Sequence, residues 1–227
     1  MSLSRRSVLV GLALAVGGCV SQRQTAMQAG SNAYVPDPYY VAMYGPVTTE
    51  PWVIPGVDIS KIDPRLLRQE VDYATYERPG TIVVDPGARF LYLVQEGGKA
   101  MRYGVGVGKT EAFNFQGEAS IQRKAEWPRW TPTKDMIARE PERYGPVADG
   151  MPGGPDNPLG PRALYLYQNG RDTLYRIHGT TEPHTIGKKV SSGCVRLFNQ
   201  DIIDLYGRVP VGAKVVVLPS PAEAGTV

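Results

Sequence analysis

Short apolar runs, alternating or continuous, follow one another from Pro79 onward, and Gly, Pro, Asn or Asp bounds each of them. Runs of this length, rich in β-branched and aromatic residues, are typical of β-strands. The predicted strands are Thr81–Val84, Arg89–Val94, Ala100–Gly108, Ala119–Glu126, Arg162–Tyr167, Leu174–His178 and Lys214–Leu218. The one convincing helical period is Asn199–Tyr206, which ends at Gly207. The pattern predicts a mainly β domain over residues 79–219, followed by a C-terminal tail at 220–227.

One long segment, Trp127–Gly160, interrupts these runs and is rich in proline and glycine. Proline removes backbone donors and glycine favours turns, so the segment is predicted to contain no regular element. A loop this long in a compact domain is usually functional, as a lid or as a wall of a substrate site. We therefore expect an active-site loop here.

The start of the chain has the composition of an export signal. The basic pair Arg5-Arg6 precedes an apolar run, Val8–Val16, that is too short to span a membrane. Residues 1–18 are therefore predicted to be a signal peptide, exported by the general or the twin-arginine route. The ending Val16-Gly17-Gly18-Cys19 resembles the lipobox of bacterial lipoproteins, which implies lipid attachment at Cys19. The alternative is an ordinary signal peptide that is cut nearby.

Residues 19–78 are predicted to be a lipid-anchored tether that holds the domain away from the bilayer. From Ser21 to about Thr49 the chain is rich in proline and tyrosine and has no sustained period. A short, partly helical piece is expected at Ile62–Val71, with Asp63 as its N-cap and Pro64 at the first helical position. Some tyrosines exceed what a spacer needs and are expected to pack on the domain; they are Tyr34, Tyr39, Tyr40 and Tyr44.

The charge balance gives no reason to expect a nucleic acid partner. The chain has 25 Lys and Arg against 22 Asp and Glu, a net charge of +3. Removal of Arg5-Arg6 with the signal peptide leaves 23 against 22, or +1. A nearly neutral net charge does not favour binding to the phosphate backbone of a nucleic acid.

Nucleotide and metal sites are also not favoured. Gly104–Thr110 ends like a phosphate-binding loop, but Tyr103 replaces the first glycine and no helical period follows. His178, His184 and Cys194 have spacings of six and ten, which fit no recognised zinc pattern. No metal or other cofactor is predicted.

The candidate chemistry lies between His178 and Arg196. Cys194 is the only cysteine in the body of the chain, and His178 stands sixteen positions before it. A lone thiol and an imidazole in a Gly-punctuated loop are a candidate nucleophile and base. An inert core cysteine is the alternative, but the neighbouring residues are polar or small, as in a tight exposed loop.

This segment resembles the active-site motif of the L,D-transpeptidases, the YkuD-type catalytic domain of bacterial cell-wall synthesis. The two halves of the motif are His178-Gly179-Thr180 and Ser191-Ser192-Gly193-Cys194-Val195-Arg196. The resemblance covers about Gly80 to Leu218 and implies a mainly β fold, a β-sandwich with one or two short helices. Ser192 stands where many members carry a second histidine. His184 replaces an expected aromatic residue, which argues that it is a wall residue and not the base.

The residue chemistry and the resemblance together assign roles. Cys194 is the expected nucleophile and His178 its base. The backbone N–H groups of Gly193 and Cys194 are the expected donors to the oxyanion. Arg196 either binds a carboxylate or forms a structural ion pair. The other residues expected to contact substrate are Ser191, Ser192, Gly179 and Thr180.

The resemblance implies a peptidoglycan tetrapeptide stem as the acyl donor, held by Cys194 as a thioester after D-alanine is released. An amine of a neighbouring stem gives a cross-link, an amine of an outer-membrane protein or lipoprotein gives protein attachment to the wall, and water gives hydrolysis. The expected location is the periplasm, on a lipid anchor. Two alternatives stay open, a non-catalytic peptidoglycan-binding module and a scaffolding lipoprotein, and both predict an unreactive thiol.

Overall fold

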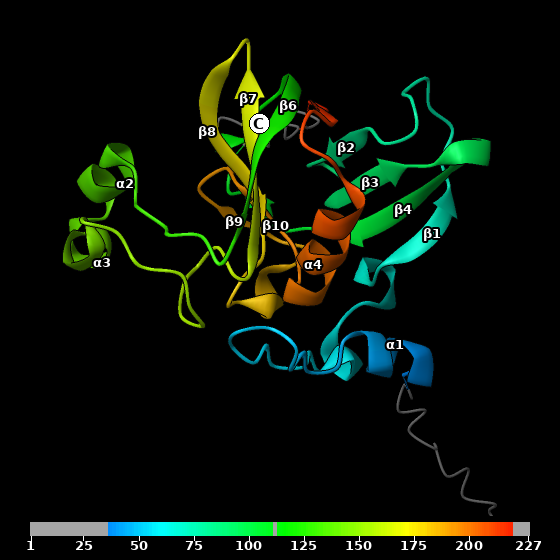
Figure 1. Cartoon of the computed structure of the whole chain (residues 1–227), viewed down its shortest axis with the longest axis horizontal. Helices are drawn as coiled ribbons and strands as arrows, with labels where there is room; N and C mark the ends of the chain where they lie inside the picture. Colours follow the sequence, from blue (N-terminus) through cyan, green and yellow to red (C-terminus); the bar gives the residue numbers. More distant parts are fainter. Residues whose placement is uncertain (1–35, 111–112, 220–227) are drawn as a thin grey trace, which may run out of the picture. The chain divides into compact units, whose positions relative to one another are not determined.

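The computed structural model describes residues 36–110 and 113–219 (Figure 1). The predicted signal peptide, Cys19, the first part of the predicted tether and the tail at 220–227 lie outside the described residues. Across the two described ranges, no helix has both the length and the apolar character needed to cross a membrane.

The fold is built on one long sheet, and most of its neighbouring strands are antiparallel. Strand β10 pairs in parallel with β8, and β11 pairs in parallel with β2. In spatial order the strands are β1 (Gln69–Asp72), β4 (Lys99–Gly104), β3 (Phe90–Val94), β2 (Ile82–Asp85), β11 (Lys214–Val217), β6 (Gly117–Glu126), β7 (Arg162–Gln168), β8 (Arg171–His178) and β10 (Val195–Arg196). A second, smaller sheet pairs β5 (Val107–Gly108) with β9 (Lys189–Ser191). The prediction of a mainly β fold is confirmed.

Helices are few and short. The α-helices are α1 (Pro38–Met43), α2 (Lys134–Arg139), α3 (Pro141–Tyr144) and α4 (Asn199–Arg208). Single 3-10 turns lie at Ile59–Lys61, Pro64–Leu66, Glu96–Gly98, Gly145–Val147 and Pro183–Thr185. The predicted C-terminal helix is present as α4, and it continues to Arg208 instead of ending at Gly207.

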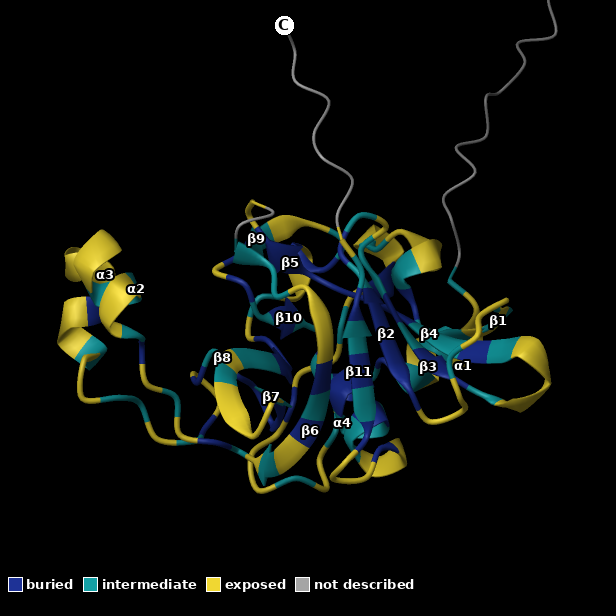
Figure 2. Ribbon diagram, turned by 90° about the horizontal axis from the view of Figure 1, so that it is seen from above, coloured by how far each residue is buried: buried dark blue, intermediate teal, exposed yellow. Residues whose placement is uncertain are grey.

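Helix α4 packs beside the sheet, in contact with β7 (Figure 1). Its Ile202 and Leu205 are fully buried in the main core. In β2, the residues Ile82, Val83 and Val84 are all buried, so this strand is covered on both faces (Figure 2). Each fully buried aliphatic side chain contributes about 1.5–3 kcal/mol, which makes this core the rigid support for the strands that follow.

Strands β7 and β8 form a tight hairpin that fixes where His178 lies. The connection is Asn169-Gly170, and both residues have positive φ, at 51° and 74°. Positive φ at both central positions is the signature of a type I′ turn, which Asn-Gly favours. The register places His178 opposite Ala163, at the far end of the hairpin from the turn.

The predicted strand Ala100–Gly108 is wrong as a single element. It is divided into β4 and β5, which belong to different sheets. A Cβ at Gly104 would lie 2.5 Å from the Leu66 carbonyl oxygen, and one at Gly106 would lie 2.9 Å from that of Thr185. The chain passes close to other backbone at both glycines, and it changes sheets between them.

The described part of the predicted tether, residues 36–78, is part of the folded domain and not a free spacer. Strand β1 pairs with β4 at the edge of the main sheet. A second core joins Tyr44, Ile59 and Leu67 of this segment to Ile186 and Phe198. The capping prediction is confirmed, because the Asp63 side chain accepts from the Arg65 N–H at the start of the Pro64–Leu66 turn. Of the predicted tyrosines, Tyr44 is fully buried and Tyr39 is exposed.

A buried polar network ties this segment to α4. The Tyr44 hydroxyl donates to both carboxyl oxygens of Asp201 at 3.0 Å and accepts from the Arg68 backbone N–H at 2.6 Å. Burial raises the pKa of Asp201 to about 7, against the opposing effects of the Arg68 charge and the Tyr44 hydrogen bond. Gln200 Nε2 donates to the Gly45 and Pro55 carbonyls at 3.1 and 3.0 Å. The sequence shows no periodic signal for this network, so reading the segment as a tether overlooked it.

Candidate active site

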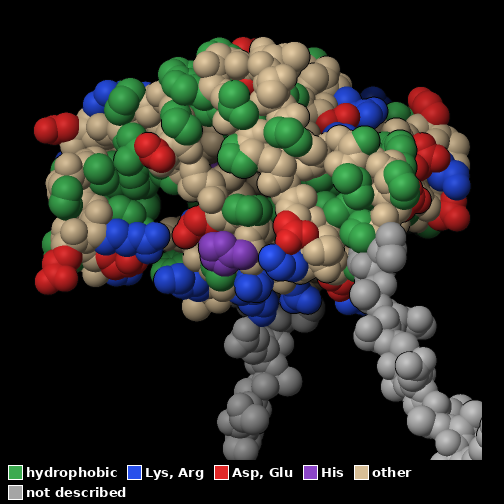
Figure 3. Space-filling model, turned by 90° about the horizontal axis from the view of Figure 1, so that it is seen from below, with side chains coloured by type: hydrophobic (Ala, Val, Ile, Leu, Met, Phe, Trp, Pro, Cys, Tyr) green, Lys and Arg blue, Asp and Glu red, His purple; other side chains and the backbone are tan. Residues whose placement is uncertain are grey.

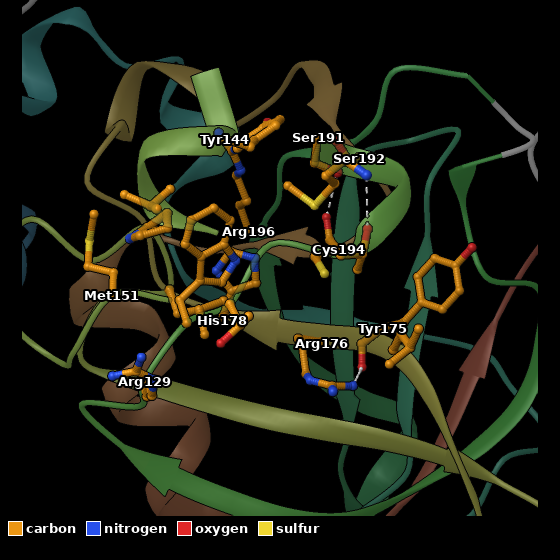
Figure 4. Close-up of a pocket in the computed structure, with 18 of the residues that line it drawn as sticks. Arg129, Tyr144, Met151, Tyr175, Arg176, His178, Ser191, Ser192, Cys194 and Arg196 are labelled. Atoms are coloured by element: carbon orange, nitrogen blue, oxygen red, sulfur yellow. Dashed lines mark hydrogen bonds between the residues drawn. The ribbon is translucent and has the colours of Figure 1, made fainter. Parts of the chain in front are cut away.

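Cys194 and His178 lie on neighbouring strand segments because β10 runs parallel to β8. The register pairs Val195 with Ile177 and Arg196 with His178. Side chains alternate along a strand, so Cys194 and Arg196 share a face with Arg176 and His178. All four of these residues line one cavity of about 960 Å³ (Figure 4). The structure therefore brings together the predicted nucleophile and the predicted base.

His178 is 5 % exposed and is held by its own backbone neighbour. Its Nδ1 lies 2.6 Å from the Gly179 carbonyl oxygen. A carbonyl only accepts, so Nδ1 carries the proton and Nε2 keeps a lone pair. Burial lowers the pKa of His178 to about 3, and the positive charge of Arg196 adds to this effect. The imidazole is therefore neutral near pH 7 and able to accept a proton.

The Cys194 thiol is protonated at rest. Burial raises its pKa, against the hydrogen bond from the Arg176 backbone N–H and the positive charges of Arg176 and Arg196. In the described part of the chain, which includes both residues, no hydrogen bond joins the Cys194 thiol to the His178 ring. In a free enzyme such contacts are often long and tighten only with substrate. The resting pair is thus a thiol and a neutral imidazole, not a thiolate and an imidazolium.

Gly193 makes the tight turn before the thiol. Its φ is +127°, and a Cβ would lie 2.2 Å from the Phe113 carbonyl oxygen and 2.7 Å from a Tyr175 ring carbon. Any other residue would have to displace backbone, so the position requires glycine.

One of the two predicted oxyanion donors is already occupied. The Gly193 N–H donates to Ser191 Oγ at 3.0 Å. That hydroxyl donates to the Cys194 carbonyl at 2.7 Å (Figure 4). The prediction for Gly193 is therefore wrong in this structure, because Ser191 takes up its N–H. Among the residues described, no partner is found for the Cys194 N–H, which leaves it as the remaining donor.

The predicted substrate contacts divide into two groups. Ser191, Ser192 and Arg196 line the cavity, and the Ser192 hydroxyl lies 3.4 Å from an Arg139 nitrogen. Gly179 and Thr180 do not line it. They lie against α4, where a Cβ on Gly179 would be 2.3 Å from Asn199 Oδ1. Their prediction as substrate contacts is wrong because packing against α4 encloses them.

Arg196 forms the ion pair that was one of its two predicted roles. Its Nη1 lies 2.7 Å from a carboxyl oxygen of Glu182, and both residues line the cavity. His184 is exposed on the Pro183–Thr185 turn and is absent from the cavity wall. The prediction of a wall role for His184 is therefore wrong, because the turn directs this residue to the surface.

The segment Trp127–Gly160 supplies the outer wall of the cavity and was wrongly predicted to lack regular structure. It carries α2 and α3, and Thr133 caps α2 by accepting from the Met136 N–H. Both helices stand apart from the sheets on two extended connections (Figure 2). The surface is open between this part and the rest of the domain (Figure 3). Residues Trp130, Met136, Arg139, Tyr144 and Met151 of the segment line the cavity.

The two connections of this segment are fastened together at their base. Trp130 and Met151 exchange backbone hydrogen bonds at 2.9 and 2.7 Å. Asn157 is 1 % exposed, and its Nδ2 donates to the Pro128 and Pro152 carbonyls at 3.0 and 2.9 Å. Sequence reasoning missed this role of Asn157, although an asparagine inside a Pro-Gly-rich stretch is a signal of side-chain hydrogen bonding to backbone.

Residues of the N-terminal segment 36–78 also contact the two ends of the Trp127–Gly160 segment. A Glu50 carboxyl oxygen accepts from Trp127 Nε1 at 2.9 Å, and the other accepts from Arg162 Nη2 at 2.6 Å. Trp52 packs on Trp127 with ring centres 4.9 Å apart. Trp127 begins the loop and Arg162 begins β7, so residues outside the predicted catalytic domain fix both ends of the cavity's outer wall.

Burial of neutral His178 predicts a pH dependence of stability. Its pKa is about 3 in the folded protein and 6.5 in the unfolded chain, so between these values only the unfolded chain binds the proton. Stability from this residue is complete above pH 6.5 and is lost as the pH falls toward 3. In His178→Asn, the amide nitrogen replaces Nδ1 as donor and the titration disappears. The unfolding free energy of the wild type minus that of His178→Asn is expected to rise by about 1.4 kcal/mol per pH unit between about pH 4 and 6.

Urea unfolding of both proteins at several pH values measures this difference. Subtracting the variant cancels the opposite contribution of Asp201, whose raised pKa favours the folded state at low pH. Parallel stability curves for the two proteins would contradict a buried, neutral His178.

Comparison with known proteins identifies the family. A family model described as the YkuD L,D-transpeptidase catalytic domain matches residues 79–217. This is more than half of the 227 residues, so the chain belongs to the YkuD family of L,D-transpeptidase catalytic domains. The resemblance found in the sequence is confirmed.

Two relatives from Escherichia coli strain K12 are similar to about two thirds of the chain. The probable L,D-transpeptidase YbiS is 40 % identical over 149 residues, which are 64 % of this chain and 46 % of that protein. The probable L,D-transpeptidase ErfK/SrfK is 35 % identical over 150 residues, 66 % of this chain and 47 % of that protein. The chain thus spans about half the length of the curated relatives it matches.

Among solved structures, one from Brucella melitensis is described as a probable carnitine operon oxidoreductase. It is 53 % identical in sequence, covers 71 % of this chain and 99 % of that chain, and superimposes with a TM-score of 0.48. A superposition at that score adds nothing to the family assignment.

Proposed function

We propose that this protein is a cysteine-dependent L,D-transpeptidase that acts on peptidoglycan tetrapeptide stems. The observation that supports this most is the cavity in which Cys194 and His178 share one face of paired strands, with Nε2 of the histidine left unprotonated. Membership of the YkuD family gives the reaction class. A binding module has no need for this pair, which disfavours a non-catalytic wall-binding or scaffolding role.

The first half of the proposed reaction forms a thioester. Cys194 Sγ attacks the amide carbonyl between the third residue of the stem and the terminal D-alanine, and its proton passes to His178 Nε2. The Cys194 N–H donates to the oxygen of the tetrahedral intermediate. When the intermediate collapses, the C–N bond breaks and the imidazolium gives its proton to the leaving amine, which departs as D-alanine.

The second half returns the free enzyme. An acceptor amine attacks the thioester carbonyl while His178 takes the amine proton. The C–S bond then breaks, and the sulfur regains its proton from the imidazolium. An amine on a neighbouring stem yields a cross-link, and an amine on an outer-membrane protein or lipoprotein yields attachment of that protein to the wall. Water in place of the amine yields a shortened stem.

The charges around the thiol favour this chemistry without creating a permanent thiolate. Arg176 and Arg196 both lower the pKa of Cys194, so they stabilise negative charge on sulfur as the proton leaves. Arg196 is already paired with Glu182 at 2.7 Å. We therefore assign Arg196 to fixing the cavity wall and supplying positive charge, and a carboxylate of the stem would reach it only through its remaining N–H groups.

Export and lipid attachment at Cys19 are part of the proposal, resting on the small residues before that cysteine and the short apolar run ahead of them. The protein would then work at a membrane of the cell envelope, in the periplasm, with the stem peptides of the wall as its substrate. Fractionation of cells that carry Cys19→Ser tests the anchor, and an unchanged membrane fraction would remove it from the proposal.

The reaction itself is tested with purified disaccharide-tetrapeptide and the chain from residue 20 onward, which leaves out the signal peptide and Cys19. We expect release of D-alanine together with a dimeric product. When a competing amine is added, we expect a product in which the shortened stem is joined to that amine. Release of D-alanine without dimer would identify water as the acceptor in the assay. If the protein is folded and its thiol is titratable but no D-alanine is released, the proposed enzyme function would be wrong and a wall-binding role would take its place.

A further inference from the structure

The orientation of the His178 ring depends on a single peptide plane. The ring donates through Nδ1 to the carbonyl of the next residue, Gly179, at 2.6 Å. The direction of that carbonyl is set by the plane of the Gly179–Thr180 peptide. Whatever holds this plane therefore decides which nitrogen of His178 carries the proton.

The other edge of the same peptide is held by Asn199. The Thr180 N–H donates to Asn199 Oδ1 at 2.8 Å. No cis peptide bond occurs in the described part of the chain, and in a trans peptide the N–H and C=O point in opposite directions. A bond from Thr180 N–H toward α4 therefore turns the Gly179 carbonyl away from α4, toward the imidazole.

The Asn199 oxygen is fitted closely into this place. A Cβ on Gly179 would lie 2.3 Å from it, and a Cβ on Gly160 would lie 2.5 Å from it. Asn199 is the first residue of α4, whose Ile202 and Leu205 are fully buried in the main core. The acceptor is thus carried by a rigid helix, and two glycines leave room for it.

Asn199 has no evident capping role that would explain it otherwise. Phe198 is the N-cap of α4, and no side-chain hydrogen bond caps this helix. Asn199 is also absent from the residues that line the cavity. Its side-chain oxygen accepts from the Thr180 N–H and lies close against Gly179 and Gly160.

We propose that Asn199 is a positioning residue which, through the Gly179–Thr180 peptide, keeps the His178 proton on Nδ1 and leaves Nε2 free to accept the thiol proton. This inference rests on the proposed function for the role of Nε2, but the tautomer itself exists whether or not the protein is an enzyme. The residue acts on the base and does not touch substrate.

Nitrogen NMR of ¹⁵N-histidine-labelled protein tests the tautomer directly. The chain contains two histidines, and exposed His184 serves as the internal reference. In the wild type we expect a protonated Nδ1 and an unprotonated Nε2 for His178. In Asn199→Ala we expect loss of this single tautomer, whereas Asn199→Asp keeps an acceptor oxygen and should retain it. Asn199→Ser replaces the alanine variant if that one does not fold, because the serine side chain is too short for its oxygen to reach the Thr180 N–H.

Steady-state kinetics with the tetrapeptide donor give the second readout. A correctly placed general base contributes on the order of 10²-fold or more, so kcat of Asn199→Ala should fall by about 10²-fold with KM changed little. Asn199→Asp should recover most of kcat. Asp85→Ala is the matched control. Asp85 Oδ1 accepts from the Ala88 N–H at 2.8 Å, so this change also removes a side-chain acceptor for a backbone N–H, at a different place in the fold. It should leave the His178 signals unchanged.

The outcomes separate this inference from the proposed function. An unchanged His178 tautomer in Asn199→Ala would overturn the positioning role, even if activity fell. A tautomer that changes between the wild type and Asn199→Ala, in a protein whose wild type shows no transpeptidase activity, would uphold the positioning role and defeat the proposed enzyme function. Loss of activity in Asn199→Asp as complete as in Asn199→Ala would also count against a role carried by the acceptor oxygen.

Discussion

Cys194→Ala is expected to abolish release of D-alanine from the tetrapeptide donor while the domain stays folded. The Cys194 thiol lines the cavity on the same strand face as the neutral imidazole of His178, which places it to form a covalent acyl intermediate. Without a nucleophile, the remaining backbone donor and the binding site cannot split the amide, so turnover should fall by about 10⁴-fold or more. The measurement is the initial rate of D-alanine release by both proteins at equal concentration.

His184→Ala is the control for this experiment. The chain has two histidines, and His184 is exposed and does not line the cavity. We expect this variant to keep its rate within a few-fold of the wild type, while His178→Ala loses nearly as much as Cys194→Ala. If His184→Ala were as damaging as His178→Ala, the assignment of the base would be wrong.

Tyr44→Phe is expected to destabilise the whole domain, although it lies outside the residues matched by the family model. The change removes one hydroxyl that serves the Asp201 carboxyl and the Arg68 N–H, both at buried or partly buried positions. Each buried polar group that loses its partner costs about 1–3 kcal/mol, so the free energy of unfolding should fall by about 2–4 kcal/mol. Urea unfolding of the two proteins at pH 7 measures the difference.

Tyr39→Phe is the matched control, since it makes the same chemical change five positions earlier on a side chain that is 64 % exposed. Its unfolding free energy should stay within about 0.5 kcal/mol of the wild type. Equal, small effects at both positions would mean that residues 36–78 are only loosely attached, as the tether prediction had it.

The strands and the catalytic pair were predictable from the sequence because both have local signals. A continuous apolar and aromatic run defines β3, and the Asn199–Tyr206 period defines most of α4. Cys194 and His178 were found because a lone thiol in a small, polar loop is chemically distinctive. Strand pairing then placed them together, with Arg176 two positions before His178 on the same face.

The parts that failed depend on contacts between distant residues. Tyr44 is a core residue only because Asp201, 157 positions later, supplies its partner. The Gly193 N–H was expected to face the oxyanion, but the Ser191 hydroxyl occupies it, and no spacing rule predicts that rotamer. Helices α2 and α3 are too short for a periodic signal and lie between prolines, so composition alone favoured an irregular loop.

The central claim, that Cys194 becomes acylated by the stem peptide, is tested most directly by the intact mass of the protein. The chain from residue 20 onward, its Cys194→Ala variant and its His184→Ala variant are each mixed with disaccharide-tetrapeptide and quenched in acid. We predict a transient mass increase equal to the donor minus D-alanine on the wild type and on His184→Ala, and none on Cys194→Ala. An adduct that persists in Cys194→Ala, or no adduct on any folded protein during measurable turnover, would contradict a thioester at Cys194.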